Sequence, residues 1–168
     1  ILRDHQRVRI DAFLNPGDPS YEGNFQVIQS MTAIGSGGFF GKGLFNGTIS
    51  QYGFLPVTES DFIFAVLGEE FGFVGMAVVI ILFFLFLSRI YSISKHAKDF
   101  YGTLVTTGFM GMLFYQILQN IGMTIGLMPV TGVTLPFVSY GGSSMLTTMM
   151  IIALIMNIYS KSHSSFAY

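Results

Sequence analysis

The sequence lacks cysteine and has few charged residues. Without cysteine the chain can form neither disulfides nor thiolate metal sites, although this says little about its compartment. Charged residues make up 10% of the chain, with 8 lysines and arginines against 9 aspartates and glutamates. Nucleic-acid binding needs a dense cationic face, so these few scattered basic residues argue against a nucleic-acid role.

The chain also lacks an initiating methionine. It begins at Ile1 without a basic leader or a cleavable apolar segment, so we expect a piece of a longer protein with helices upstream. Hydrophobic residues make up 51% of the sequence and phenylalanine occurs 18 times, which is too apolar for an ordinary soluble domain of this length. The composition predicts a membrane protein.

The order of polar and apolar blocks predicts an all-α membrane protein with three transmembrane helices after a long loop. The first block is polar and broken by glycine and proline, which is typical of a loop with short helical pieces. Three apolar runs approach the roughly 20 residues that a membrane span needs. Prolines and glycines before the third run forbid a continuous helix there and predict a surface or re-entrant loop. The predicted segments are a loop at 1–61, spans at 62–89, 101–127 and 144–159, connections at 90–100 and 128–143, and a tail at 160–168.

Basic residues predict the orientation of the spans. Arg89, Lys95 and Lys98 follow the first span and Lys161 follows the third, whereas 128–143 carries no charge. The positive-inside rule therefore places 90–100 and the tail in the cytoplasm and the two long loops outside. Three arginines near the N-terminus argue the other way, but long loops translocate largely regardless of charge.

The glycine-rich stretch GSGGFFGKG, residues 35–43, resembles a nucleotide-binding loop only superficially. That pattern needs glycine where Ser36 stands and serine or threonine where Gly43 stands, so a nucleotide loop is excluded. Two alternatives stay open. Its amides and Lys42 could hold a pyrophosphate, or the stretch could be a structural turn that uses the conformational freedom of glycine.

Small and amide residues within the apolar runs have a structural interpretation. Gly68 and Gly72, like Gly122 and Gly126, have the spacing of closely packed membrane helices. The amides within the second predicted span could line a polar path, but bonds to neighbouring helices are the favoured interpretation. These amides are Gln116, Gln119 and Asn120.

The three histidines are far apart and lie in loops or tails. His5, His96 and His163 have neither the spacing of metal ligands nor an adjacent pair of carboxylates. We interpret all three as solvated surface residues.

Carboxylates near the first span attract a functional hypothesis because ionisable groups are costly near hydrocarbon. Asp61 immediately precedes the apolar run, and Glu69 and Glu70 follow about 12 Å further along a helix. The two glutamates could pack in a polar bundle or cap a re-entrant helix. Asp61 could also be a helix N-cap, and from pattern alone this alternative comes first.

Three long strings carry a resemblance to a known family. QVIQSMTAIGSGGFFGKG, FLPVTESDFIFAVLGEEFGFVG and QNIGMTIGLMPVTGVTLPFVSYGGSS resemble the C-terminal half of the shape, elongation, division and sporulation (SEDS) family. The resemblance runs in order across nearly the whole chain. It implies the large extracellular loop and the last three of ten membrane helices of a multi-pass protein of the bacterial plasma membrane.

The resemblance implies that the full protein is a peptidoglycan glycosyltransferase that polymerises lipid II into glycan strands for cell-wall elongation. The family's essential aspartate falls on Asp61, which a general-base role suits. We expect no organic cofactor, since the lipid-linked donor is already activated. A divalent cation, Mg or Mn, could neutralise the leaving pyrophosphate. The expected substrate-binding residues are Lys42, Ser36, Glu59, Ser60, Pro136, Ser139, Ser143 and Ser144.

The expected partners are lipid II, the growing glycan strand, membrane lipids and a class B penicillin-binding protein that acts as the transpeptidase. Glu59 and Ser60 stand where the family usually has histidine and threonine, which alters the surroundings of the aspartate. Thr131 stands where division-type members carry lysine, so the elongation branch, RodA-like more than FtsW-like, is the closer resemblance. A flippase for lipid-linked precursors and a non-catalytic scaffold for a transpeptidase stay open as alternatives.

Overall fold

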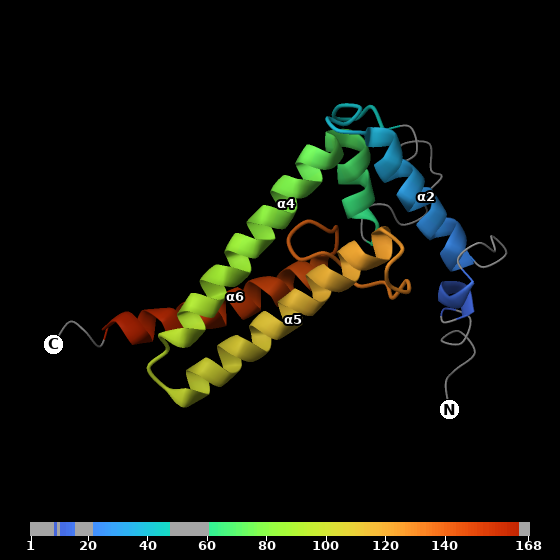
Figure 1. Ribbon diagram of the computed structural model, residues 1–168. Helices are drawn as coiled ribbons and strands as arrows, with labels where there is room; N and C mark the ends of the chain where they lie inside the picture. Colours follow the sequence, from blue (N-terminus) through green and yellow to red (C-terminus); the bar gives the residue numbers. More distant parts are fainter. Residues whose placement is uncertain (1–8, 10, 16–21, 48–60, 165–168) are drawn as a thin grey trace.

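The computed structural model describes residues 9, 11–15, 22–47 and 61–164, and in this part of the chain all regular structure is helical. The long segment of α4 packs along α5, α6 joins them through the buried cluster of Ile90, Leu113, Ile151 and Ile155, and α2 packs at the other end of α4 (Figure 1). The all-α prediction is confirmed for the described residues. The helices are α2 (Glu22–Gly37), α4 (Ile63–Lys95), α5 (Phe100–Thr124) and α6 (Gly142–Ser164).

Two of these helices, α4 and α6, are long and apolar enough to cross a membrane. The most apolar stretch of α4 has a mean hydropathy of 2.7, and only 11% of it is buried within the described residues. An apolar surface of this extent is typical of contact with lipid or with further helices. The α5 helix does not pass the same hydropathy test, so its expected role as a third span stays a prediction.

The first predicted span is not one continuous helix. Gly72 has φ 65° and ψ −161°, values that break α4 into a short segment, residues 63–71, and a long one, residues 73–95. In Figure 1 the short segment climbs beside α2, and the long segment turns at the top and descends toward α5 and α6. The predicted span at 62–89 overlaps the candidate span Ile63–Lys95, and its boundaries stay a prediction. The structure adds an interruption at Gly72, and the long segment continues to Lys95 into the predicted connection.

The glycine-rich loop that follows α2 closes this break. A broken helix leaves carbonyls unpaired on one side and amides unpaired on the other. The loop supplies partners for both sides through four backbone hydrogen bonds. They are Lys42 N to Glu69 O and Gly43 N to Glu70 O, each 3.0 Å, and Phe73 N to Gly38 O and Val74 N to Phe39 O, 3.0 and 3.2 Å.

Close backbone approach between the loop and α4 depends on glycine. A Cβ on Gly41 would overlap the carbonyl of Glu70, and one on Gly72 would overlap the amide of Gly41. A Cβ on Gly68 would lie 3.0 Å from the Ile34 side chain, so the predicted close packing is confirmed at Gly68. At Gly72 the same prediction is wrong, because that glycine forms the turn itself.

The α2 helix packs against the short segment of α4 and against the end of α5. Ala33, Phe62 and Ala65 form a buried cluster, and the buried Ser30 hydroxyl donates to the Thr124 carbonyl at 2.8 Å. The sequence predicted only short helical pieces here, whereas α2 has 16 residues. This helix fixes the first turns of α4 against the C-terminal end of α5.

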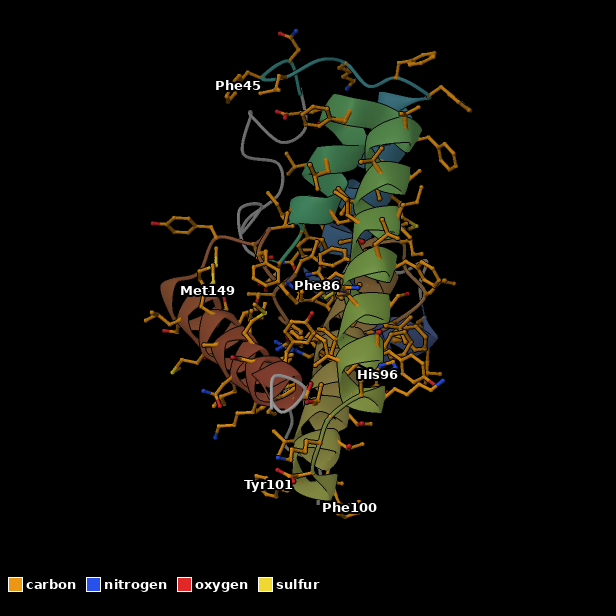
Figure 2. The ribbon with its side chains drawn as sticks, turned by 90° about the vertical axis from the view of Figure 1, so that its left-hand side faces the viewer. Phe45, Phe86, His96, Phe100, Tyr101 and Met149 are labelled. Carbon is orange, nitrogen blue, oxygen red and sulfur yellow. The ribbon has the colours of Figure 1, made fainter. Side chains whose placement is uncertain are left out.

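The polar connection after α5 is irregular, as predicted. Residues 128–141 contain turns and extended backbone, and α6 begins at Gly142. Leu135 is fully buried in a cluster with Phe64, Phe83 and Ile117, so this connection penetrates between α4 and α5. Near the middle of the molecule, where Figure 2 labels Phe86, that ring packs edge-on against Phe137, with centroids 5.6 Å apart.

Candidate functional site

Asp61 lies at the start of α4, half-buried, immediately before the helix. The helix begins at Ile63, and its N-cap position is Phe62, which is 1% exposed. The sequence alternative in which Asp61 occupies the N-cap is wrong in position, because Asp61 stands one residue outside it. The carboxylate therefore lies beside the first turn of α4, here called the α4 entrance, where the buried side chain of Phe62 fixes the backbone.

Asn120 of α5 holds this entrance in place. Its amide nitrogen donates to the Asp61 carbonyl at 2.9 Å and to the Val133 carbonyl at 2.8 Å, and the side chain is fully buried. A buried carbonyl without a donor costs about 1–3 kcal/mol, so both bonds contribute to the geometry. Three elements meet at one amide: the start of α4, the middle of α5 and the 128–141 connection. The predicted structural role of Asn120 is confirmed.

The connection approaches the Asp61 carboxylate at Gly132. This glycine has φ 71°, a left-handed conformation, and a Cβ built on it would lie 3.4 Å from Asp61 Oδ2. The carboxylate therefore faces the connection. Gly132 has no side chain, so its backbone is what stands on this side of Asp61.

Polar side chains fasten the connection itself. Gln119 donates to the Pro129 carbonyl at 3.0 Å, which confirms its predicted structural role. The Ser139 hydroxyl is buried and accepts a hydrogen bond from the Leu135 amide at 2.7 Å. Ser139 was expected to bind substrate, and the structure places its hydroxyl inside a turn of the connection.

A polar cavity of about 190 Å³ lies between α5, the connection and α6. Pro136, Ser143 and Ser144, all expected in the substrate site, line this cavity together. Gln116, which the sequence offered as a possible lining of a polar path, also lines it. Sequence analysis missed three other polar lining residues, although two of them follow the two serines at a helical spacing of four. The missed residues are Thr134, Thr147 and Thr148.

Lys42 lies at the other end of the short α4 segment. Its ammonium group pairs with Glu69 Oε1 at 2.8 Å, where the carboxylate is fully buried and the lysine side chain is 27% exposed. Glu69 follows Asp61 by eight positions, and the helix from Ile63 to Glu69 rises about 9 Å. The structure therefore places Lys42 at the break in α4, apart from the entrance where Asp61 lies.

Three expected site residues remain, and the structure describes one of them, Ser36. Ser36 is exposed on the last turn of α2, and its hydroxyl donates to the Ala33 carbonyl at 2.8 Å. Glu59 and Ser60 lie outside the described residues. Since the amides of Lys42 and Gly43 bond to α4, the glycine-rich stretch matches the structural alternative.

The described residues do not form a metal site. No three histidine or acidic side chains gather in this part of the chain, and Asp61 is the carboxylate at the α4 entrance. Mg²⁺ is commonly held by one or two carboxylates together with substrate phosphates, so this finding does not test the expected Mg or Mn ion, and no step below passes through a metal. The divalent cation stays a prediction, which removal of metals with a chelator during a polymerisation assay would test.

A family model described as a cell cycle protein, covering FtsW, RodA and SpoVE, matches residues 1–164. The chain belongs to this family. The peptidoglycan glycosyltransferase RodA of Treponema pallidum is 45% identical over 161 residues, covering 96% of this chain and 37% of its own length. The stage V sporulation protein E of Bacillus subtilis is 43% identical over 155 residues, covering 91% of this chain and 42% of its own length.

A solved structure also resembles the chain over most of its length. It belongs to a peptidoglycan synthase complex that coordinates polymerization and crosslinking. The TM-score is 0.76 at 34% identity, over 96% of this chain and 43% of the solved chain. The chain thus spans about two-fifths of the length of the curated relatives it matches.

Proposed function

We propose that the protein containing this chain is a peptidoglycan glycosyltransferase that polymerises lipid II, with Asp61 as its general base. The observation that supports this most is the placement of Asp61, beside the entrance of α4 and facing the connection at Gly132. Family membership and a curated relative named as a peptidoglycan glycosyltransferase supply the reaction class.

The chemistry is a single displacement. Asp61 takes the proton of the 4-hydroxyl of one sugar while that oxygen attacks the anomeric carbon of the next. The bond between the anomeric carbon and the phosphate oxygen breaks, and undecaprenyl pyrophosphate leaves with the electron pair. Because the donor linkage is α and the product linkage is β, one direct displacement inverts the configuration.

Two polar regions have complementary roles in this proposal. Asn120 positions Asp61 through its backbone carbonyl and fixes the connection beside it. The cavity lined by Pro136, Ser143 and Ser144 offers hydroxyl groups that could bind a sugar or peptide portion of the substrate. We derive no substrate contact for Lys42, which is paired with Glu69 at the break.

The surroundings of the protein follow from the same proposal. We place α4, α5 and α6 in the bacterial plasma membrane, with the Asp61 end outside and the 96–99 turn in the cytoplasm. A class B penicillin-binding protein is the proposed partner, because glycan strands must be crosslinked after polymerisation. Purification of the full-length protein with such a transpeptidase, and stimulation of polymerisation by it, would test the pairing.

The decisive assay is lipid II polymerisation by the full-length protein and its Asp61→Asn variant. Asparagine keeps the size of the side chain and removes the base, so we expect a loss of about a hundredfold to ten-thousandfold. Glu59→Gln is the matched control and should lose less activity. Normal polymerisation by a folded Asp61→Asn protein would refute the assignment and favour a role in translocation.

A further inference from the structure

A second cavity lies far along α4 from Asp61, between the last turns of α4 and α6. Its volume is about 280 Å³, and its lining residues are Arg89, Ser92, Ile93, His96 and Tyr159. Four of these five side chains carry hydrogen-bonding groups. Two helices that are distant in sequence therefore build a polar recess at the end of the bundle opposite the break at Gly72.

The charge of this recess is positive. Arg89 is exposed, and within the described residues its guanidinium group makes no hydrogen bond or ion pair. His96 bonds through Nδ1 to the Ser92 carbonyl at 2.8 Å, which fixes the ring and leaves its Nε2 edge for another partner. Lys95, Lys98 and Lys161 add charge at the same end of the bundle. Asp99 is the single acidic residue in the sequence after Glu70.

Aromatic residues indicate the depth of the recess. Tyr91, Phe100 and Tyr101 are 60%, 83% and 75% exposed, and Figure 2 shows Phe100 and Tyr101 at the lower tip with His96 higher on α4. Exposed tyrosines at the end of an apolar helix are typical of the membrane interface. The apolar part of α4 ends just before Arg89, so the recess lies at the depth of lipid headgroups.

We propose that this recess binds the phosphate group of an anionic phospholipid. A guanidinium group pairs with two phosphate oxygens at once, and the serine and tyrosine hydroxyls can donate further hydrogen bonds. His96 Nε2 can donate as well when both ring nitrogens carry a proton. Basic recesses between membrane helices on the cytoplasmic side bind such headgroups in other proteins. Ile93 supplies an apolar surface beside the lipid chains, which a free phosphate ion would not use.

The test uses the full-length protein in nanodiscs of phosphatidylcholine with a minor fraction of phosphatidylglycerol. Lipids retained after release are counted by native mass spectrometry. Arg89→Gln should lower the retained phosphatidylglycerol by about tenfold, the loss expected for one charge-assisted hydrogen-bonding group. Lys98→Gln is the matched control, since Lys98 is exposed, does not line the recess and loses the same charge. Tyr159→Phe should give a smaller loss.

Two results would overturn the proposal. Equal losses of retained phosphatidylglycerol in Arg89→Gln and Lys98→Gln would show that the lipid is attracted by the overall positive charge and not bound in the recess. Displacement of phosphatidylglycerol by millimolar inorganic phosphate would show a site for free phosphate. Thermal unfolding midpoints of the variants, measured on the same samples, separate a lost site from a lost fold. Polymerisation is not part of the readout, so the test is independent of the function proposed for Asp61.

Discussion

The two ends of the short α4 segment are stabilised in different ways. At the Gly72 end, backbone hydrogen bonds and the ion pair between Lys42 and the buried Glu69 join the glycine-rich loop to the helix. At the other end, the buried amide of Asn120 bonds to the Asp61 carbonyl, and the Asp61 carboxylate faces Gly132. The first end joins backbone to backbone, whereas the second places an ionisable group beside the 128–141 connection. Substitutions at the first end should therefore reduce stability, and substitutions at the second should reduce activity.

The largest loss of stability is expected for Gly72→Ala. Alanine at this backbone conformation is strained, and its Cβ would overlap the amide of Gly41. We expect a loss of about 4 kcal/mol, seen as a lower thermal midpoint of the full-length protein. Gly35→Ala is the control, because a Cβ there meets no atom within 4 Å. Equal thermal midpoints for the two variants would contradict the claim that the close contact between Gly72 and the glycine-rich loop stabilises the fold.

The second-largest loss of folding stability, about 3 kcal/mol, is expected for Lys42→Met, because this change removes the cation that pairs with the buried Glu69 carboxylate. Thermal unfolding again measures the effect. Lys98→Met removes an exposed lysine and should change the midpoint little. If adding Glu69→Leu to the Lys42→Met protein restored the thermal midpoint, the unpaired buried charge would be established as the cause of the loss.

Asn120→Ala should cost about 2 kcal/mol, since the Asp61 and Val133 carbonyls both lose their donor. Because Asp61 is positioned through this bond, polymerisation per folded molecule should fall as well. Asn157→Ala, on the exposed face of α6, is the control. A normal polymerisation rate together with a lowered thermal midpoint would show that Asn120 stabilises the fold and does not position Asp61 for catalysis.

Gly132→Ala should have the smallest effect on stability, about 1 kcal/mol for a left-handed alanine. Its effect on activity should be larger, because the new methyl group would stand 3.4 Å from Asp61 Oδ2. Gly38→Ala is matched in backbone conformation, with φ 56° and no neighbouring atom within 4 Å. Equal polymerisation rates for the two alanine variants would mean that the space beside Asp61 is not used.

Sequence patterns anticipated the helices and the irregular connection better than the break. Proline and glycine within 128–143 stopped any helical pattern, so that connection was predictable. Glu69 and Glu70 interrupt the apolar run just before Gly72, but the spacing of Gly72 from Gly68 matches that of packed helices. Only the contact with residues 38–43, distant in sequence, shows that Gly72 is a turn.

The site was predictable in its residue types and less so in its contacts. The cost of polar groups near hydrocarbon singled out the carboxylate of Asp61 and the amide of Asn120, but only the family resemblance assigned the catalytic role to Asp61. The hydrogen bond from the Asn120 amide to the Asp61 carbonyl could not be predicted, because no sequence pattern indicates a bond to a backbone carbonyl 59 positions away. Thr147 and Thr148 were missed because hydroxyls in an apolar helix commonly bond the preceding turn, as Thr148 does to the Ser144 carbonyl at 2.8 Å.

The most direct test of the account compares Asp61→Asn with Lys42→Met in the full-length protein, measuring polymerisation per folded molecule and the thermal midpoint on the same samples. The account predicts that Asp61→Asn loses about a hundredfold or more in rate with an unchanged midpoint. Lys42→Met should lower the thermal unfolding midpoint, whereas the molecules that remain folded should still polymerise lipid II. An Asp61→Asn protein that polymerises normally but unfolds at a lower temperature would contradict the account.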